Sequence, residues 1–262
     1  MESKKKPQVI VSLTSFPGAI AYAPGAIRSI LRGSILPDKI VLYVTKAEFG
    51  EEGLPREITE LEKEYDIFEV RDYPRNIRSY RKLVPALRDF PEDIVVTIDD
   101  DVDYPADMLK KLLQLHREFP EDIIAHRAKR ILADKPYKKW KKYRWYHFLR
   151  QRIIRRFDTM QTGVGGVLYP PYSLKAEMLA TDDLFTTLSP TADDIWFWAA
   201  AVANGRRVIP VPFGYNKPRG LGKPRELSLK QINFKAGNDR NFAQFQAVVQ
   251  AFPELRDLAN AE

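Results

Sequence analysis

The sequence of 262 residues contains no cysteine and only three histidines. Without cysteine there is no disulfide framework and no thiolate metal site, and so few histidines exclude a histidine-rich zinc site. Any bound metal should therefore be held mainly by oxygen. The chain also lacks the run of about 20 apolar residues that spans a bilayer, and no apolar region follows the lysines at 4–6. We therefore expect a cytoplasmic protein.

The charge and size of the chain set the class of partner and the domain count. A net charge of +7 indicates an anionic partner, which charge alone leaves open among nucleic acid, a membrane surface and phosphorylated substrates. With 44% hydrophobic residues, the chain can bury the core of one large domain. We expect that domain to span residues 1–225 and a helical extension, packed on it, to span 226–262.

Three consecutive aspartates, Asp99, Asp100 and Asp101, follow the apolar run at 94–98. A β-branched run that ends in acids is typical of a buried strand. Adjacent carboxylates repel one another, so the cluster indicates a site for Mg²⁺ or Mn²⁺. Since side chains alternate along a strand, we expect Asp99 and Asp101 to point to one side and Asp100 away from it. The competing interpretation is a solvated acidic turn.

Strands and helices alternate through the first half of the chain. The pattern predicts strands at 8–14, 39–44, 66–70 and 94–98, and helices at 24–36, 54–65 and 79–90. This alternation predicts an α/β fold with a mostly parallel sheet flanked by helices. Ligands of such sheets bind beyond the carboxyl ends of the strands, which is where the aspartates lie.

The second half is less regular. We expect a helix at 106–119 and a short strand at 123–127, followed by a basic and aromatic segment at 135–157. That composition suits peripheral contact with an anionic membrane surface. The competing interpretation is a solvated helix whose aromatic side chains face the core. Single-stranded nucleic acid also accepts cations mixed with rings, but no nucleic-acid module is visible and we expect no nucleic-acid partner.

A glycine-rich turn at 162–171 contains Gly163, Gly165 and Gly166 and enters a predicted strand. Glycine lets the backbone approach a ligand closely, although it serves bends as often.

The acidic pair Asp193 and Asp194 opens an apolar helical run that ends near 204–205. Acids in a first helical turn favour the helix dipole, so simple capping is one interpretation. The position of the pair after the glycine-rich strand favours a catalytic role.

The order of these motifs resembles the bacterial glycosyltransferases of the GT-A fold, near the family 2 type and the capsule or O-antigen polysaccharide enzymes. The resemblance covers about residues 8–215 and rests mainly on 97–101 and 192–194, with 79–82 as lesser support. It implies a GT-A, Rossmann-like single domain with the C-terminal helical extension.

The resemblance also implies roles for the acids. Asp101 would ligate the cation that bridges the donor diphosphate, with Asp99 at the ribose or a metal-bound water and Asp100 within the same nucleotide-binding motif. Asp194 matches the general base of inverting members, and Asp193 replaces it if the register differs by one. The resemblance places these further residues against the donor or acceptor: Thr14 and Ser15 at the base or ribose, Arg78, Ser79 and Lys82 at the diphosphate, and Gly163, Gly165 and Gly166 at the donor sugar or acceptor.

The chain departs from the family pattern in two places. Many relatives supply a late histidine as a metal ligand, but none follows His147, so Asn216, Asp239 or water would replace it. The acidic pair is Asp-Asp where many relatives have Glu-Asp, which leaves the base and the stereochemical outcome open. A polar loop at 214–225 suits a mobile lid over phosphates.

These observations predict a metal-dependent glycosyltransferase that moves a sugar from a nucleotide-sugar donor, with a UDP-sugar expected, to a hydroxyl of a cell-surface polysaccharide or lipid-linked glycan. Membrane contact would occur at the inner face through 135–157. One alternative is a sugar nucleotidyltransferase, which also binds magnesium through acids. It predicts a glycine-rich phosphate loop after the first strand, where 14–18 supplies one glycine. The other alternative is a basic nucleic-acid-binding protein.

Overall fold

A computed structural model describes residues 6–143, 156–212, 217–224, 226, 233 and 239–260. Its centre is a seven-stranded sheet in the order β11-β6-β10-β4-β1-β2-β3. The strands are β1 (Val9–Thr14), β2 (Lys39–Val44), β3 (Phe68–Asp72), β4 (Ile94–Thr97), β6 (Ile123–Ala125), β10 (Val167–Tyr169) and β11 (Val208–Pro210). Only β10 runs antiparallel to its neighbours in this sheet, so the predicted mostly parallel α/β fold is confirmed.

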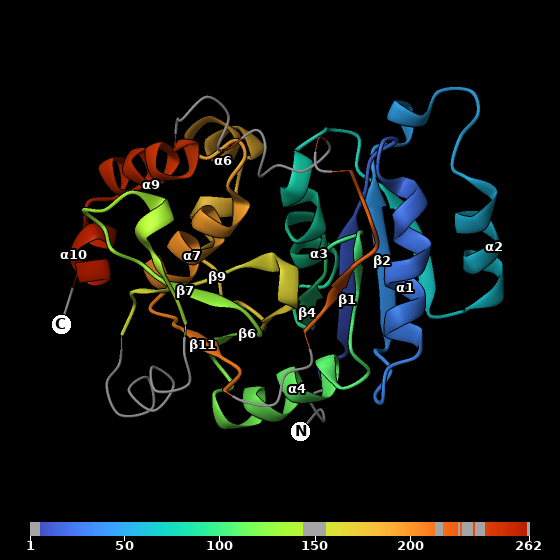
Figure 1. Ribbon diagram of the computed structural model, residues 1–262, viewed down its shortest axis with the longest axis horizontal. Helices are drawn as coiled ribbons and strands as arrows, with labels where there is room; N and C mark the ends of the chain where they lie inside the picture. Colours follow the sequence, from blue (N-terminus) through green and yellow to red (C-terminus); the bar gives the residue numbers. More distant parts are fainter. Residues whose placement is uncertain are drawn as a thin grey trace, which may run out of the picture.

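Helices cover both faces of the sheet (Figure 1). One face packs against α1 (Ala23–Leu31), α2 (Arg56–Glu64) and α4 (Met108–Glu118). The other packs against α3 (Val84–Asp89), α6 (Asp182–Leu188), α7 (Asp193–Ala203), α9 (Arg240–Ala251) and α10 (Glu254–Asn260). Along β1, Ile10 faces the second layer and Val11 the first, and both are fully buried. Burial on both sides explains why the strands read as continuous apolar runs.

Two small sheets flank the main one. The pair β5 (Val102–Asp103) and β12 (Arg219–Gly220) is antiparallel, and β7 (Ala128–Arg130) lies between β8 (Lys141–Lys142) and β9 (Thr159–Gln161). Both follow directly from the site strands, because β5 continues from the three aspartates and β7 follows β6.

Several predicted boundaries were wrong. The helix expected at 24–36 ends at Leu31, since a tight turn brings the Gly33 backbone so close to the Ile30 carbonyl that a Cβ would lie 2.8 Å from that oxygen. The helix expected at 79–90 divides into the 3₁₀ turn η3 (Arg78–Lys82) and α3, with Pro85 in the first turn of α3. Proline has no N–H to continue a preceding helix.

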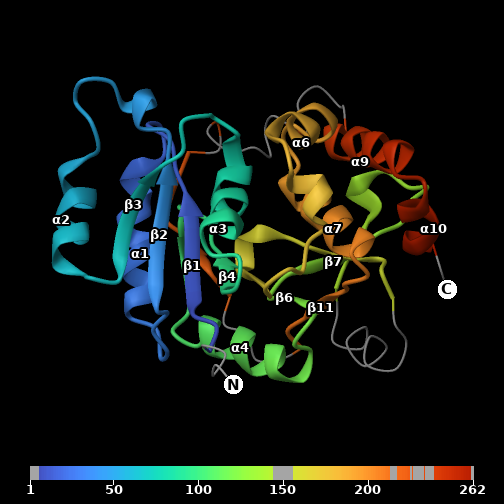
Figure 2. The same ribbon diagram turned by 180° about the vertical axis from the view of Figure 1, so that it is seen from behind.

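The C-terminal helices pack on α7 at the end of the molecule opposite α1 and α2 (Figures 1 and 2). The rings of Trp198 and Phe245 lie 5.7 Å apart between α7 and α9. The proposed domain boundary at residue 225 lies outside the described residues, and the division at that point stays a prediction.

The basic and aromatic segment is described only at 135–143 and 156–157. Its described rings Tyr137 and Trp140 are buried, and Trp140 packs edge-on against Phe245 at 5.0 Å. These rings therefore face the core, as the competing interpretation expected. No helix within the described residues is long and apolar enough to cross a membrane.

Candidate functional site

The carboxyl ends of β1 and β4 meet the start of α7 and the turn η5 (Gly163–Gly165) around one lysine. The Lys82 ammonium lies 3.1 Å from Asp99 Oδ1 and 3.2 Å from Asp193 Oδ2. Its side chain is only 9% exposed. Four regions of the sequence that were singled out separately therefore converge on one point.

Lys82 is fixed by its backbone as well as by its charge. The Ser12 hydroxyl on β1 donates a hydrogen bond of 2.6 Å to the Lys82 carbonyl. Burial alone would lower the pKa of the Lys82 ammonium, but the charges of Asp193, Asp99 and Asp194 outweigh it and raise the pKa well above its ordinary value. Lys82 is therefore a permanent buried cation.

Asp194 is the carboxylate of this cluster with the most unusual acidity. The Gly163 N–H donates to Asp194 Oδ1 at 3.1 Å. Burial, followed by the charge of Asp193, raises the pKa of Asp194 to about 7, although Lys82 and the Gly163 hydrogen bond act in the opposite direction. A carboxyl that titrates near neutrality can take up and release a proton under working conditions.

Gly163 lets the backbone enter the space between these charges. A Cβ on Gly163 would lie 2.8 Å from Lys82 Nζ and 3.4 Å from Asp99 Oδ1. Glycine is therefore required here for close approach rather than for a bend.

We expect Gly163→Ala to push the pinned Lys82 ammonium away from its carboxylates and to lower the free energy of unfolding by about 1–2 kcal/mol. Urea unfolding of the variant measures this loss. Gly220→Ala is the matched control, since a Cβ there meets nothing within 4 Å, and it should unfold like the parent. Equal stability of the two variants would contradict the tight packing inferred at Gly163.

The three aspartates do not follow the predicted alternation. Asp100 accepts a hydrogen bond from the Ser15 hydroxyl and lies 3.1 Å from Lys223 Nζ, while Asp101 lies 2.7 Å from the same ammonium. Asp99 faces Lys82 instead. The expectation that Asp99 and Asp101 point together, with Asp100 away, was wrong because β4 ends at Thr97 and the aspartates lie in the turn beyond it.

Sequence reasoning did not assign Lys223 to the site. The segment before it pairs β12 with β5, and the Leu221 N–H donates to the Asp101 carbonyl at 2.8 Å. Burial raises the pKa of Asp100, which Lys223 and Ser15 partly offset. The only signal for Lys223 was the polar composition of 214–225. Residues 213–216 and 225 lie outside the described residues, and the lid stays a prediction.

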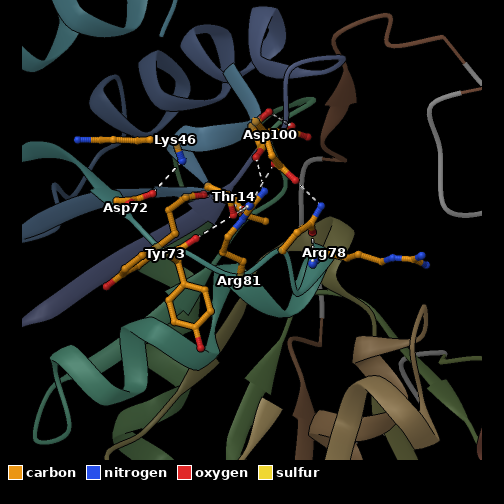
Figure 3. A network of polar contacts seen from close by, with 12 residues as sticks. Thr14, Lys46, Asp72, Tyr73, Arg78, Arg81 and Asp100 are labelled. Atoms are coloured by element: carbon orange, nitrogen blue, oxygen red, sulfur yellow. Dashed lines mark hydrogen bonds and ion pairs between the residues drawn. The ribbon is translucent and has the colours of Figure 1, made fainter. Parts of the chain in front are cut away.

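Thr14 and Ser15 lie at the site but are held by Arg81 (Figure 3). The Arg81 guanidinium is buried and donates to Thr14 Oγ1 at 2.8 Å and to the Ser15 carbonyl at 2.7 Å. It also donates to Thr45 Oγ1, which ties the end of β1 to the end of β2. Arg81 therefore shapes the rim of the site from within.

Arg78 and Ser79 lie just before Lys82 in η3. Arg78 has a positive φ of 55°, a region that non-glycine residues rarely adopt, and its exposed side chain extends away from the neighbouring labelled residues (Figure 3). The Ser79 hydroxyl is buried and has no hydrogen-bond partner among the described residues. The predicted diphosphate contacts of both residues stay predictions.

Gly165 and Gly166 serve packing. A Cβ on Gly165 would lie 3.0 Å from His126 Cβ, and one on Gly166, whose φ is +88°, would lie 3.0 Å from Met108 Sδ. Both therefore face protein atoms, and the expectation that they line a sugar or acceptor was wrong.

A metal site at Asp99 and Asp101 stays a prediction. The described residues include no group of three or more acid, histidine or cysteine side chains placed to hold a metal ion. The two carboxylates are 28% and 27% exposed, and each has one ammonium neighbour. Two carboxylates are enough for Mg²⁺ when the remaining ligands are phosphate oxygens and water. The residues therefore fit a cation that arrives with a nucleotide.

Comparisons with known proteins bear on the fold and on one functional prediction. The chain matches a crystal structure of 4-diphosphocytidyl-2C-methyl-D-erythritol synthase, with 13% identity, coverage of 87% of this chain and 99% of that chain, and a TM-score of 0.46. No family model and no curated protein sequence matches the chain. The matched synthase is a nucleotidyltransferase, and no glycosyltransferase family is found, so the predicted glycosyltransferase function is contradicted. The polysaccharide or lipid-linked acceptor is withdrawn with it.

Proposed function

We propose that this protein is a nucleotidyltransferase that transfers a nucleotidyl group from a nucleoside triphosphate to a small acceptor. In that reaction an acceptor oxygen attacks the α-phosphorus. The bond from that phosphorus to the oxygen bridging to the β-phosphate breaks, and diphosphate leaves with the electron pair. The demands on the protein are positioning and stabilisation of charge.

The observation that supports this proposal most is the pair of lysines at the strand ends. Lys82 is buried and Lys223 is 15% exposed, and together they contact Asp99, Asp100, Asp101 and Asp193. Such fixed ammonium groups are suited to bind a polyphosphate and to stabilise leaving diphosphate. Their carboxylate neighbours keep them charged, since the pKa values of both lysines are raised above the ordinary value in spite of burial.

Magnesium is the second expected participant. Asp99 and Asp101 would hold the Mg²⁺ that accompanies the triphosphate, and the cation would offset negative charge on the phosphates. Asp194, with its pKa raised to about 7, is placed to take the proton of an acceptor oxygen as that oxygen attacks. Asp193 keeps Lys82 charged and in place rather than acting as the base.

Calorimetric titration with ATP, CTP, GTP and UTP, each with magnesium chloride, tests the donor site. We expect at least one triphosphate to bind and inorganic diphosphate to compete with it. Asp101→Asn should weaken that binding about tenfold or more, because one ligand to the cation and one partner of Lys223 are changed.

Asp103→Asn is the matched control for this titration. Asp103 lies two residues further on, is 40% exposed and pairs with Arg32 outside the lysine cluster. It should bind triphosphate like the parent. If no triphosphate binds, or if Asp101→Asn binds as tightly as the parent, the proposal fails.

A further inference from the structure

Two cations on the other side of Asp194 are not used by the proposed donor site. Lys129 lies on β7, and its ammonium stands 3.6 Å from the centre of the Tyr137 ring. Arg127 immediately precedes β7 and is exposed. Within the described part of the chain, neither side chain forms an ion pair with a carboxylate.

The backbone links these cations to Asp194. In the ladder between β7 and β9, Ala128 is paired with Gln161, and the Gln161 side-chain amide donates to the Asp194 carbonyl at 3.1 Å. The Thr162 N–H donates to the Arg127 carbonyl at 2.9 Å, one residue before Gly163 contacts Asp194. The two cations therefore border the turn that positions the Asp194 carboxylate.

The surroundings of Lys129 leave a positive charge without a counter-charge. Burial lowers the pKa of Lys129 to about 8, Arg127 lowers it further, and the more distant Asp239 and Asp194 oppose the shift. The residue opposite Lys129 on β8 is another cation, Lys142. By contrast, Arg130 on the same strand is paired with Asp158 at 2.8 Å.

A half-buried ammonium without a carboxylate partner is unfavourable for folding, so its presence needs a reason. Contact with the Tyr137 ring offsets part of this penalty. A bound anion would offset the rest, and the open guanidinium of Arg127 offers the fork that fits phosphate oxygens. The lysine and the arginine together therefore form half of an anion site that faces the reacting end of Asp194.

We propose that Arg127 and Lys129 bind a phosphate monoester on the acceptor, so that the acceptor of this enzyme is a phosphorylated molecule. This assignment rests on the proposed nucleotidyl transfer. It places the donor phosphates at Lys82 and Lys223 and the acceptor phosphate at Arg127 and Lys129, with Asp194 between the two groups. A negatively charged acceptor also agrees with the net charge of +7 on the chain.

Pyridoxal 5′-phosphate is a direct probe, because its phosphate seeks an anion site and its aldehyde forms an imine with a neutral lysine amine, releasing water. Borohydride then reduces the imine, and mass spectrometry locates the label. We expect Lys129 to be labelled faster than Lys110, which is exposed on α4, and inorganic phosphate to slow labelling at Lys129 alone. Buried Lys82, whose pKa is raised, should stay unlabelled.

Arg127→Gln should weaken protection by inorganic phosphate about tenfold, the effect of losing one charge-assisted contact. Arg117→Gln on α4 is the matched control and should leave protection unchanged. Labelling of Lys129 no faster than that of Lys110, with no protection by phosphate, would overturn the proposal.

The source of the phosphate is read from two arms of the same experiment. Glycerol 3-phosphate represents a soluble acceptor, and vesicles of phosphatidylcholine with phosphatidic acid represent a lipid headgroup. Protection in either arm supports the phosphate site and identifies its source, and protection in neither overturns it. Because labelling is done without nucleotide, a failure at Lys129 while triphosphate still binds removes only the acceptor site. A failure of triphosphate binding with Lys129 still protected removes only the donor function.

Discussion

Lys82→Met is expected to lower the free energy of unfolding by about 3–5 kcal/mol, the range found when one partner of a buried ion pair is removed. The substitution keeps the length of the side chain and removes only its charge. Asp193, which is buried, and Asp99 would then lose the ammonium that lies 3.2 and 3.1 Å from them. The cost is electrostatic, since no large cavity forms.

A second substitution separates this cost from a packing defect. Asp193 Oδ2 is buried and makes no hydrogen bond within the described residues, and the Lys82 ammonium is the cation that faces it there. Lys82→Met combined with Asp193→Asn removes both charges and should recover a large part of the lost stability. The double variant should still fail to bind nucleoside triphosphate, because the buried cation is gone.

Urea unfolding at pH 7 measures the stability of both variants, and calorimetry with magnesium and triphosphate measures binding. Lys110→Met is the control, since Lys110 is exposed on α4 and its replacement should change stability by about 0.5 kcal/mol or less. A loss of under about 1 kcal/mol in Lys82→Met, or no recovery in the double variant, would show that Lys82 is not the centre of the charge cluster.

The sheet was the part of this molecule that its sequence predicted best. β2 was predicted at its observed bounds and β1 within one residue, because each is a β-branched run buried on both faces. Helix ends were predicted less well. The turn that ends α1 depends on contact with residues far along the chain, such as the 2.8 Å hydrogen bond from the Ser34 N–H to the Ala106 carbonyl.

The site was predicted by its acids and only partly by its cations. Asp99, Asp193 and Asp194 were all singled out, because acids after a strand or at the start of a helix are visible in sequence. Whether a lysine is buried among them is set by tertiary packing, so the central position of Lys82 emerged only from the fold.

The error in function has a related cause. Acids at strand ends and a close glycine turn serve any enzyme that handles a nucleotide diphosphate, so the order of such motifs does not separate sugar transfer from nucleotidyl transfer. The separation depends on the cations that face the phosphates. Lys223 is 123 residues from Asp100 in the sequence, Lys129 lies in a short strand without a motif, and neither gives a local signal.

Asp194→Asn is expected to abolish transfer while leaving the fold and triphosphate binding intact. General acid–base catalysis contributes about 10²–10⁴-fold, and the rate should fall by that factor. The amide oxygen of the substituted side chain can still accept the hydrogen bond that the Gly163 N–H donates to Asp194 Oδ1 at 3.1 Å in the parent. In the parent, the rate should rise with pH through a midpoint near 7, where Asp194 becomes the base. Diphosphate release in the presence of acceptor measures both effects.

Stability should change in the opposite direction from activity. The pKa of Asp194 is raised in the folded protein from 3.8 to about 7, so the folded state holds the proton more tightly than the unfolded chain. The resulting stabilisation is fully present below pH 3.8 and is lost as the pH rises through about 7. Asp194→Asn removes this loss, and at pH 8 the variant should be more stable than the parent by about 2–4 kcal/mol.

Urea unfolding of parent and variant across pH 4–8 gives the test, with Asp183→Asn as the control. Asp183 is 78% exposed and pairs with Arg75 at the surface, so its variant should follow the parent at every pH. A parent and an Asp194→Asn variant with the same pH dependence would mean that Asp194 is ionised in the folded protein throughout this range. It could not then be the base that takes a proton at neutrality, and the pH dependence of transfer would have to come from the acceptor.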